Sequence, residues 1–239
     1  MFPILKKEFN SFFSSPIAYL VIGVFLLING LYLWVFKDNF NILNAGFADL
    51  SSFFYLAPWL FLFLIPAITM RSFADEFNSG TIEILKTKPL TDWQIILGKF
   101  TASLLLVFIT LIPTLTYAYT VYALGNPIGN LDLGSIAGSY FGLFFLAAIY
   151  TSIGLFTSTL SKNQIVAFII SVFITFILFY GFDTIGNSLG NSGYLFQQFG
   201  INEHFKSISR GVIDTRDVVY FISVTFFFLF ITKQQLKNE

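Results

Sequence analysis

The chain has 239 residues and no formal net charge, and its composition excludes an ordinary water-soluble domain. Hydrophobic residues make up 56% of it and charged residues only 11%, so a soluble fold of this length would expose large apolar patches. The bilayer is therefore the expected solvent. The absence of cysteine excludes disulfides and thiolate metal sites, and the absence of net positive charge argues against a nucleic-acid partner.

The N-terminal residues 4–13 predict an amphipathic helix that lies in the membrane interface. Ile4 or Leu5, Phe9, and Phe12 with Phe13 fall along one helical stripe, and the charged residues lie elsewhere. The apolar run that follows is long enough to span the membrane and is not followed by a small-x-small cleavage site, so we interpret it as a retained helix rather than a signal peptide.

Six stretches of the chain approach the roughly 20 apolar residues that a membrane-spanning helix needs. The sixth is short, so we expect it to extend into the flanking residues at the interfaces. The sequence therefore predicts an all-α, polytopic membrane protein with a single transmembrane domain over residues 1–239 and spans at 16–36, 53–70, 100–124, 135–160, 165–182 and 218–231.

The basic residues predict the orientation of these spans. With the N-terminus inside, nine lysines and arginines fall on the cytoplasmic side and four on the outer side, and positive charge in short loops favours the cytoplasm. Both termini are then cytoplasmic. The four outer residues are Lys37, Lys206, Arg210 and Arg216.

Local signals mark the ends and irregularities of the helices. The sequence from Thr91 to Gln94 forms a capping box, so a helix should begin there and continue into the third span. The sequence from Ser161 to Gln164 has the same form and should make a tight turn before the fifth span. Three prolines inside spans predict kinks or local unwinding, unless they are simply tolerated: Pro58, Pro66 and Pro113.

Gly134, Gly138 and Gly142 recur every four residues at the outer end of the fourth span. This spacing puts them on one helix face, where a neighbouring helix can approach closely. Packing within the subunit is the simpler interpretation, and an interface between two copies is the alternative.

The segment 71–99, between the second and third spans, holds eight of the 26 formal charges of the chain, whose 13 basic and 13 acidic residues cancel. A charged segment of this kind on an otherwise apolar protein is expected to contact something in water. The chain has no nucleotide-binding phosphate loop of its own, because Gly98-Lys99 lacks the upstream glycine and is followed by Phe100.

We find no ionisable residue in the middle of a predicted span, which argues against a proton pump or an ion-coupled carrier. The single histidine, His204, falls in the last outer loop, where a solvated or hydrogen-bonded side chain is the simplest interpretation. No catalytic residue, metal site or cofactor is expected.

These features together resemble the membrane subunit of a type-2 ABC exporter, over nearly the whole chain. The opening 14–19 and the segment 47–50 are most similar to the gliding-motility-associated permease of Bacteroidetes. The residues that carry the family resemblance are Arg71, Glu76, Gly80-Thr81, Glu83, Leu85, Pro89, Gly98-Lys99, the run 200–205, the run 210–214 and Tyr220-Phe221.

The resemblance implies that part of the segment 71–99 is a coupling helix docked in a groove of a separate ATPase. The corresponding residues here are Gly80, Thr81, Ile82, Glu83, Ile84, Leu85, Lys86, Lys88 and Pro89, with Ile82, Ile84 and Leu85 as the apolar anchor. The alternative is that these three apolar residues pack back on the membrane subunit while the charges are solvated.

The resemblance also implies that the outer segment 183–217 forms short half-helices that cap the export path, with Tyr194, Phe199, His204 and Phe205 as candidate gate residues. Apolar pieces of about ten residues are more plausibly re-entrant or interfacial than spanning. A passive surface loop is the alternative.

The expected function is that of an export permease in the bacterial inner membrane, non-catalytic itself, which supplies half of a translocation path. Its expected partners are an ABC ATPase, a second copy or a related membrane subunit, and the lipid bilayer. Two other classes remain open: a carrier or channel that works without ATP, and a structural anchor for a larger machine.

Overall fold

The computed structural model describes residues 1–189 and 193–238, and every regular element within them is helical. Six helical stretches are long and apolar enough to cross a membrane, which confirms the predicted all-α architecture. These candidate spans are Pro16–Val35, Ser51–Asn78, Asp92–Leu124, Leu133–Thr159, Gln164–Ser188 and Thr215–Lys237.

The α-helices are connected in places by short π- or 3₁₀-helical turns, which are labelled η. In chain order the elements are α1 (Phe2–Ser14), α2 (Pro16–Gly30), η1 (Leu31–Val35), η2 (Ile42–Asn44), α3 (Ser51–Thr69), α4 (Arg71–Asn78), α5 (Thr81–Lys86), α6 (Asp92–Leu111), η3 (Ile112–Thr114), α7 (Leu115–Leu124), α8 (Leu133–Thr159), α9 (Gln164–Phe176), η4 (Ile177–Gly181), α10 (Phe182–Ser188), α11 (Tyr194–Gln197), α12 (Ile201–Ser209) and α13 (Thr215–Asn238).

The third span begins where the capping box predicts. Thr91 Oγ1 accepts a hydrogen bond from the Gln94 amide, and the Gln94 side chain accepts one from the Thr91 amide. From there α6 continues without a break to Leu111. The span therefore starts well before residue 100 and includes Lys99. Around Pro113 the helix tightens into η3, as its proline predicts, whereas Pro58 and Pro66 lie within a continuous α3.

Two helix ends differ in detail from the sequence pattern. The turn before α9 is capped by Asn163, whose side chain accepts from the Ile165 amide, and not by Ser161. The prediction of a capping box starting at Ser161 was therefore wrong, because asparagine caps a helix at least as well as serine and lies next to its first turn. The last helix, α13, runs from Thr215 to Asn238, so the sixth span does extend beyond 218–231 at both ends.

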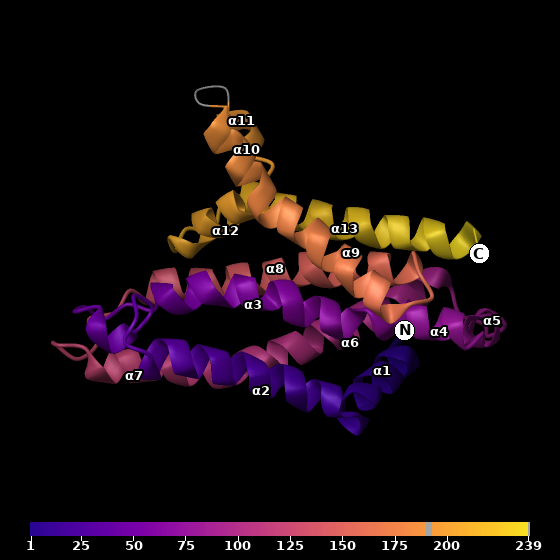
Figure 1. Ribbon diagram of the computed structural model, residues 1–239, viewed down its shortest axis with the longest axis horizontal. Coiled ribbons are helices and arrows are strands. Elements are labelled where there is room, and N and C mark those ends of the chain that lie inside the picture. The colour runs from indigo at the N-terminus through magenta and orange to yellow at the C-terminus, as the bar shows by residue number, and fades with distance from the viewer. Residues whose placement is uncertain (190–192, 239) are drawn as a thin grey trace.

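Helix α8 is the most buried of the six candidate spans and α9 is the least. Helix α8 packs against α3, α6, α9, α12 and α13, so it lies at the centre of the bundle. Both chain ends lie at the same end of this bundle as α4 and α5, whereas α7 lies at the opposite end (Figure 1). We refer to these as the inner and the outer end, following the orientation predicted from the basic residues.

At the outer end the short helix α12 lies against the glycine stripe of α8. A Cβ atom at Gly138 would approach the carbonyl oxygen of Ile208 to 2.5 Å, and one at Gly142 would approach the Phe205 ring to 3.0 Å. Two of the three glycines of the stripe therefore face α12 within the same chain. Packing against this short helix accounts for the spacing without a contact between two copies.

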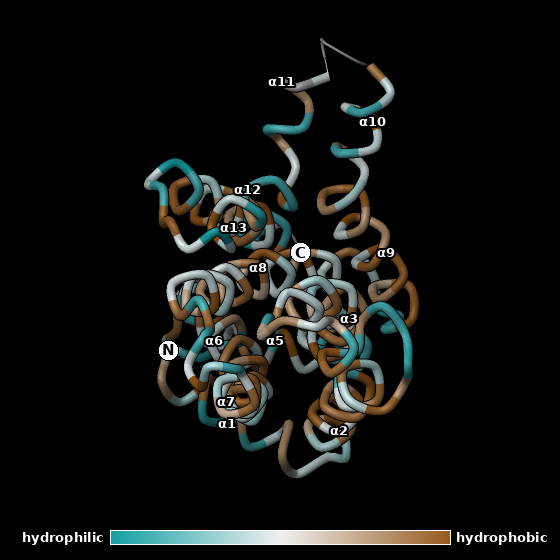
Figure 2. Tube along the Cα trace, turned by 90° about the vertical axis from the view of Figure 1, so that its left-hand side faces the viewer, coloured by the Kyte–Doolittle hydropathy of each residue, from teal (hydrophilic) through white to brown (hydrophobic). Residues whose placement is uncertain are grey.

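Helices α10 and α11 form a hairpin that extends away from the bundle (Figures 1 and 2). Their backbones meet at two glycines: a Cβ atom at Gly193 would clash with the carbonyl group of Gly186. The described residues of the outer segment form the short helices α10, α11 and α12, and α12 packs extensively on α8.

Replacing Gly138 with alanine should loosen α12 from α8, because the new methyl group would meet backbone atoms that cannot rotate away. We expect a loss of about 1–3 kcal/mol of stability, measured as a lower thermal unfolding midpoint of the detergent-purified protein. The matched control is Gly23→Ala in α2, where nothing lies within 4 Å and alanine favours the helix. Equal midpoints for the two variants would contradict this packing.

Candidate functional site

At the inner end the chain leaves the second span through α4 and turns sharply into α5. Gly80 makes this turn with φ of +69°, a left-handed conformation that glycine adopts without strain. The Gln164 side chain at the start of α9 donates a hydrogen bond to Asp75 and accepts one from Arg71 Nε. Helix α4 is therefore attached to the fifth span as well as to the second.

Helix α5 divides its side chains between the permease and the solvent. Ile82 is buried in an apolar cluster with Phe73, Phe77 and Ile95, and Leu85 is half-buried against the same cluster. Ile82 thus packs back on its own chain, which is the alternative that the sequence left open for this residue. The exposed members of the predicted coupling set are Gly80, Thr81, Glu83, Lys88 and Pro89, and the side chains of Ile84 and Lys86 lie outside the described part of the structure.

A buried ionic cluster adjoins this apolar cluster, because Lys99 Nζ lies 5.1 Å from the centre of the Phe73 ring. Lys99 of α6 is only 2% exposed, and its Nζ donates three hydrogen bonds: to Glu8 Oε1 at 2.9 Å, to Glu76 Oε1 at 2.9 Å and to the Ser72 carbonyl at 2.7 Å. An ammonium group has three donors, so all of its hydrogen-bonding capacity is used. The three helices α1, α4 and α6 meet at this one nitrogen atom.

The residue before Lys99 explains why α1 can come so close to α6. A Cβ atom at Gly98 would lie 2.8 and 2.9 Å from Ile4 side-chain atoms. The absence of a side chain at Gly98 therefore leaves the space that Ile4 of α1 occupies. Gly98 and Lys99 therefore act together, one by making room for α1 and the other by binding Glu8 of that helix. Neither residue belongs to a nucleotide-binding loop, as the sequence indicated.

Lys7 adds a fourth charge to the cluster. Its Nζ lies 3.3 Å from Glu76 Oε1 and 3.6 Å from Glu8 Oε1. Burial by itself would lower the pKa of Lys7, but the attraction of the two carboxylates outweighs it and the pKa is raised. Two lysines thus balance two glutamates. Sequence reasoning missed this cluster, although Lys99, charged and set just ahead of an apolar run, was the signal that could have revealed it.

At the outer end, polar contacts connect the short helices to one another. Asp183 of α10 accepts hydrogen bonds from Asn202 at 2.5 Å and from Lys206 at 3.3 Å, and Lys206 also binds Glu203 at 2.8 Å. Burial lowers the pKa of Lys206, but the hydrogen bond to Glu203 and the attraction of Asp183 outweigh this and the pKa is raised. These contacts tie α10 to α12.

His204 connects α12 to the last span. Its Nδ1 lies 2.7 Å from Asp217 Oδ1 of α13, its Nε2 lies 2.9 Å from the Gln198 carbonyl, and its ring stacks on Tyr220 at 3.8 Å. His204 is therefore the hydrogen-bonded residue that its sequence context suggests. Asp183, Asn202, Lys206 and Asp217 complete the network and were not singled out from the sequence, because their pairing depends on how three short helices fold back.

The four candidate gate residues do not form one surface. Phe199 is 64% exposed, Phe205 is 5% exposed and faces Gly142, and His204 lies between them in exposure. Tyr194 begins α11, and its side chain lies outside the described part of the structure. The outer segment is thus a folded cap with a buried side and an exposed side, and the gate residues are divided between the two.

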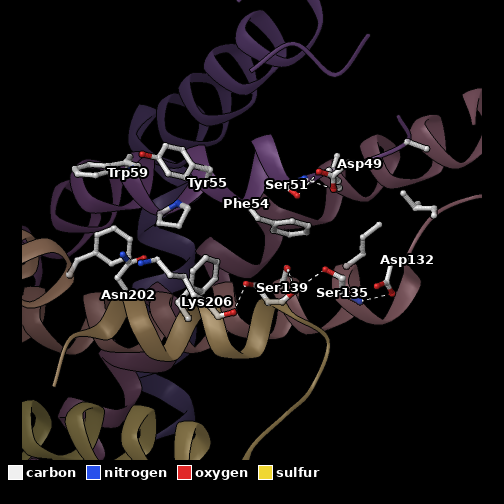
Figure 3. Close-up of a pocket in the computed structure, with 18 of the residues that line it drawn as sticks. Asp49, Ser51, Phe54, Tyr55, Trp59, Asp132, Ser135, Ser139, Asn202 and Lys206 are labelled. Carbon is white, nitrogen blue, oxygen red and sulfur yellow. Dashed lines mark hydrogen bonds between the residues drawn. The ribbon is translucent and has the colours of Figure 1, made fainter. Parts of the chain in front are cut away.

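A cavity of about 310 Å³ opens beside this cap. It lies between α3 and α12, and residues of α8 and η4 contribute to its wall. Figure 3 shows Phe54, Tyr55 and Trp59 along one side and Asn202 and Lys206 of α12 opposite them.

The sequence was compared with protein families and curated proteins. The profile of the family described as "ABC-2 family transporter protein" matches residues 2–209. The "Probable multidrug ABC transporter permease YbhR" of Escherichia coli strain K12 is 34% identical over 102 residues, as is the protein of the same name from strain O157:H7. That alignment covers 43% of this chain and 26% of each relative, so the chain spans about a quarter of the length of the curated relatives it matches.

The ionic cluster predicts a specific loss of stability. Lys99→Met should leave Glu8 and Glu76 buried with only Lys7 as a cation, at a cost of about 3 kcal/mol. The measurement is the thermal unfolding midpoint of the detergent-purified protein, with exposed Lys88→Met as the control.

Adding Glu8→Gln and Glu76→Gln to Lys99→Met should recover part of the lost stability, because it removes the uncompensated charges. A midpoint for Lys99→Met equal to that of Lys88→Met would show that the cluster does not hold the inner end together.

Proposed function

The chain belongs to the ABC-2 family of transporter proteins, and on that premise we propose that it is the membrane subunit of an exporter whose ATPase is a separate chain. The observation that carries the proposal is the construction of the inner end. A short helix, α5, is anchored by Ile82 and presents Glu83 to solvent. The apolar cluster that holds Ile82 includes Phe73, which contacts Lys99 of the ionic cluster that joins three helices. The phosphate-binding motif that ATP hydrolysis needs is missing from the sequence, which supports its assignment to a partner.

In this proposal α5 and the turn that follows it are the contact with the ATPase. Glu83 and Lys88 supply polar contacts, and the exposed part of Leu85 supplies an apolar one. A movement imposed on α5 would reach α4 through the apolar cluster and then reach α1 and α6 through Lys99. The role of the cluster is to make these helices move as one body.

At the other end, the cap formed by α10, α11 and α12 is proposed to close the outer side of the path. Its connections support this role: Asp183 ties α10 to α12, and His204 ties α12 to α13. A displacement of a span would therefore move the cap, and Phe205 would leave its place against Gly142.

We propose that the path forms between this subunit and a second copy or a related membrane subunit. The centre of the single bundle is filled by large side chains that are almost completely buried, among them Phe25, Phe53 and Phe61. A path for a solute is therefore expected at an interface between subunits and not through one bundle. The proposed location is the bacterial inner membrane with both termini in the cytoplasm, which follows from the nine-to-four division of basic residues.

A role in gliding motility is a narrower proposal that rests on the resemblance of residues 14–19 and 47–50 alone. Deletion of the gene in a gliding bacterium that carries it should abolish spreading on agar and leave growth unchanged. Normal spreading of the deletion strain would contradict the role in gliding and leave the proposal of an export function without it.

The coupling role predicts that reversing exposed charges on α5 and its following turn weakens ATPase binding. Glu83→Arg with Lys88→Glu should reduce copurification of the ATPase at least about fivefold. The reason is that each reversed side chain would repel the charge on the ATPase that the native side chain attracts at the edge of the interface. The copurified partner is identified by mass spectrometry and must itself carry a phosphate loop. Lys37→Glu, which changes a charge at the outer end of the bundle, is the control. Undiminished copurification of the double variant would place the ATPase contact elsewhere.

The gating role predicts different labelling of two phenylalanines that lie on opposite sides of the cap. In this cysteine-free chain, Phe199→Cys should react with a membrane-impermeant thiol reagent with or without ATP, because Phe199 is exposed. Phe205→Cys should react only during ATP hydrolysis, when the cap leaves Gly142. Labelling of Phe205→Cys at the same slow rate in both conditions would indicate a cap that does not move.

A further inference from the structure

The cavity beside the outer cap combines aromatic walls with uncompensated negative charge. Six aromatic side chains line it, and its exposed lining is mainly apolar. Its volume of about 310 Å³ lies at the lower end of the range of small-molecule sites. The aromatic residues are Phe54, Tyr55, Trp59, Phe179, Tyr180 and Phe205.

Trp59, Phe179 and Tyr180 form one connected aromatic wall. Trp59 of α3 lies 5.8 Å from the Phe179 ring and 5.7 Å from the Tyr180 ring. Tyr55 and Tyr180 are 63% and 44% exposed. Such a wall can hold the apolar body of a ligand, and aromatic faces also attract a cation placed over them.

Two carboxylates stand at the other end of the cavity (Figure 3). Asp49 Oδ1 accepts a hydrogen bond from the Ser51 amide at 3.0 Å, and Asp132 Oδ1 accepts one from the Ser135 amide, also at 3.0 Å. These contacts, at the starts of α3 and α8, fix the two carboxylates in position. They do not neutralise them, because an amide carries no net charge.

One cation, Lys206, also lines the cavity, but its charge is already balanced. Its Nζ binds Glu203 at 2.8 Å and Asp183 at 3.3 Å. The charged residues that line the cavity are Asp49, Asp132 and Lys206, and the ion pairs of the described residues involve Lys206 but neither of the two aspartates. The local field in the cavity therefore favours a cation.

We propose that this cavity binds a lipophilic organic cation, with its charged group towards Asp49 and Asp132 and its apolar body against Phe54, Tyr55 and Trp59. Binding at this site goes beyond the proposed export function, and only the identification of such cations as exported substrates rests on that function. An anion of the same shape would contact the same aromatic surface, but the two carboxylates would repel it.

The test uses tetraphenylphosphonium and tetraphenylborate, two ions of similar shape and opposite charge. The chain has three tryptophans, so Trp34→Phe with Trp93→Phe leaves Trp59 in the cavity wall as the only one. Fluorescence of Trp59 is titrated with each ion in protein-containing nanodiscs, with empty nanodiscs subtracted for partition into lipid. We expect saturable binding of the phosphonium at least about tenfold tighter than that of the borate.

Asp49→Asn with Asp132→Asn removes the charge of both side chains but keeps a side-chain oxygen that can accept from the Ser51 and Ser135 amides, and asparagine caps helices as well as aspartate does. This variant should bind the phosphonium about tenfold more weakly, and the preference over the borate should shrink. The matched control is Asp38→Asn, which makes the same charge change on the outer side at a residue that does not line the cavity. It should change the affinity less than twofold.

Equal affinities for the two ions would overturn the proposal, as would an unsaturable Trp59 signal or an equal effect of Asp38→Asn. The comparison of the two ions in the parent protein remains decisive if the double variant folds poorly. Copurification of the ATPase with the double variant is measured in parallel. Undiminished phosphonium binding by the double variant with retained ATPase contradicts the cavity assignment alone, whereas phosphonium binding by a parent protein that copurifies no ATPase contradicts the proposed function alone.

Discussion

The inner half of the structure depends on the neutralisation of one buried ammonium group. Lys99 is almost completely inaccessible, and an isolated charge in such a place would cost several kcal/mol. Glu8, Glu76 and the Ser72 carbonyl offset this cost, and they come from two helices that are far apart in the sequence. Because removal of any one partner leaves the others unbalanced, the positions of α1, α4 and α6 are defined together.

The outer half depends on a different constraint, the close approach of backbone to backbone. Gly138 and Gly142 leave a shallow surface on α8 that only a closely packed element can fill, and α12 fills it. Polar contacts at the rim of the cap, such as that of His204 with Asp217, then connect α12 to the last span. The inner end thus depends mainly on a buried ionic cluster, whereas the outer end combines close backbone packing with polar and ionic contacts among α10, α12 and α13.

Much of this architecture follows from short-range patterns in the sequence. Apolar runs locate all six spans because lipid demands about 20 apolar residues in each. The capping box at Thr91 gives the start of α6, and Pro113 gives its distortion, because both act within one helical turn. Glycine spacing on α8 predicts a close neighbour, although it does not identify that neighbour as the short helix α12.

The candidate sites were less predictable because they depend on contacts between distant segments. Ile82 and Glu83 are adjacent in sequence, yet one is buried in the permease and the other faces solvent. Helical periodicity alone does not decide which face of a six-residue helix is covered. Likewise, the pairing of Lys99 with Glu8 joins residues 91 positions apart. Charge spacing along the chain carries little information about such a contact.

The last helix has a further consequence. Helix α13 is 24 residues long, or about 36 Å at 1.5 Å per residue, and it is continuous. Near its first turn Asp217 holds His204 of the cap, and towards its other end Leu229 and Leu236 belong to the apolar cluster that surrounds Ile82 of α5. A helix is stiff along its axis. The inner and outer ends of the bundle are therefore mechanically connected by a single continuous helix that packs along the central helix α8.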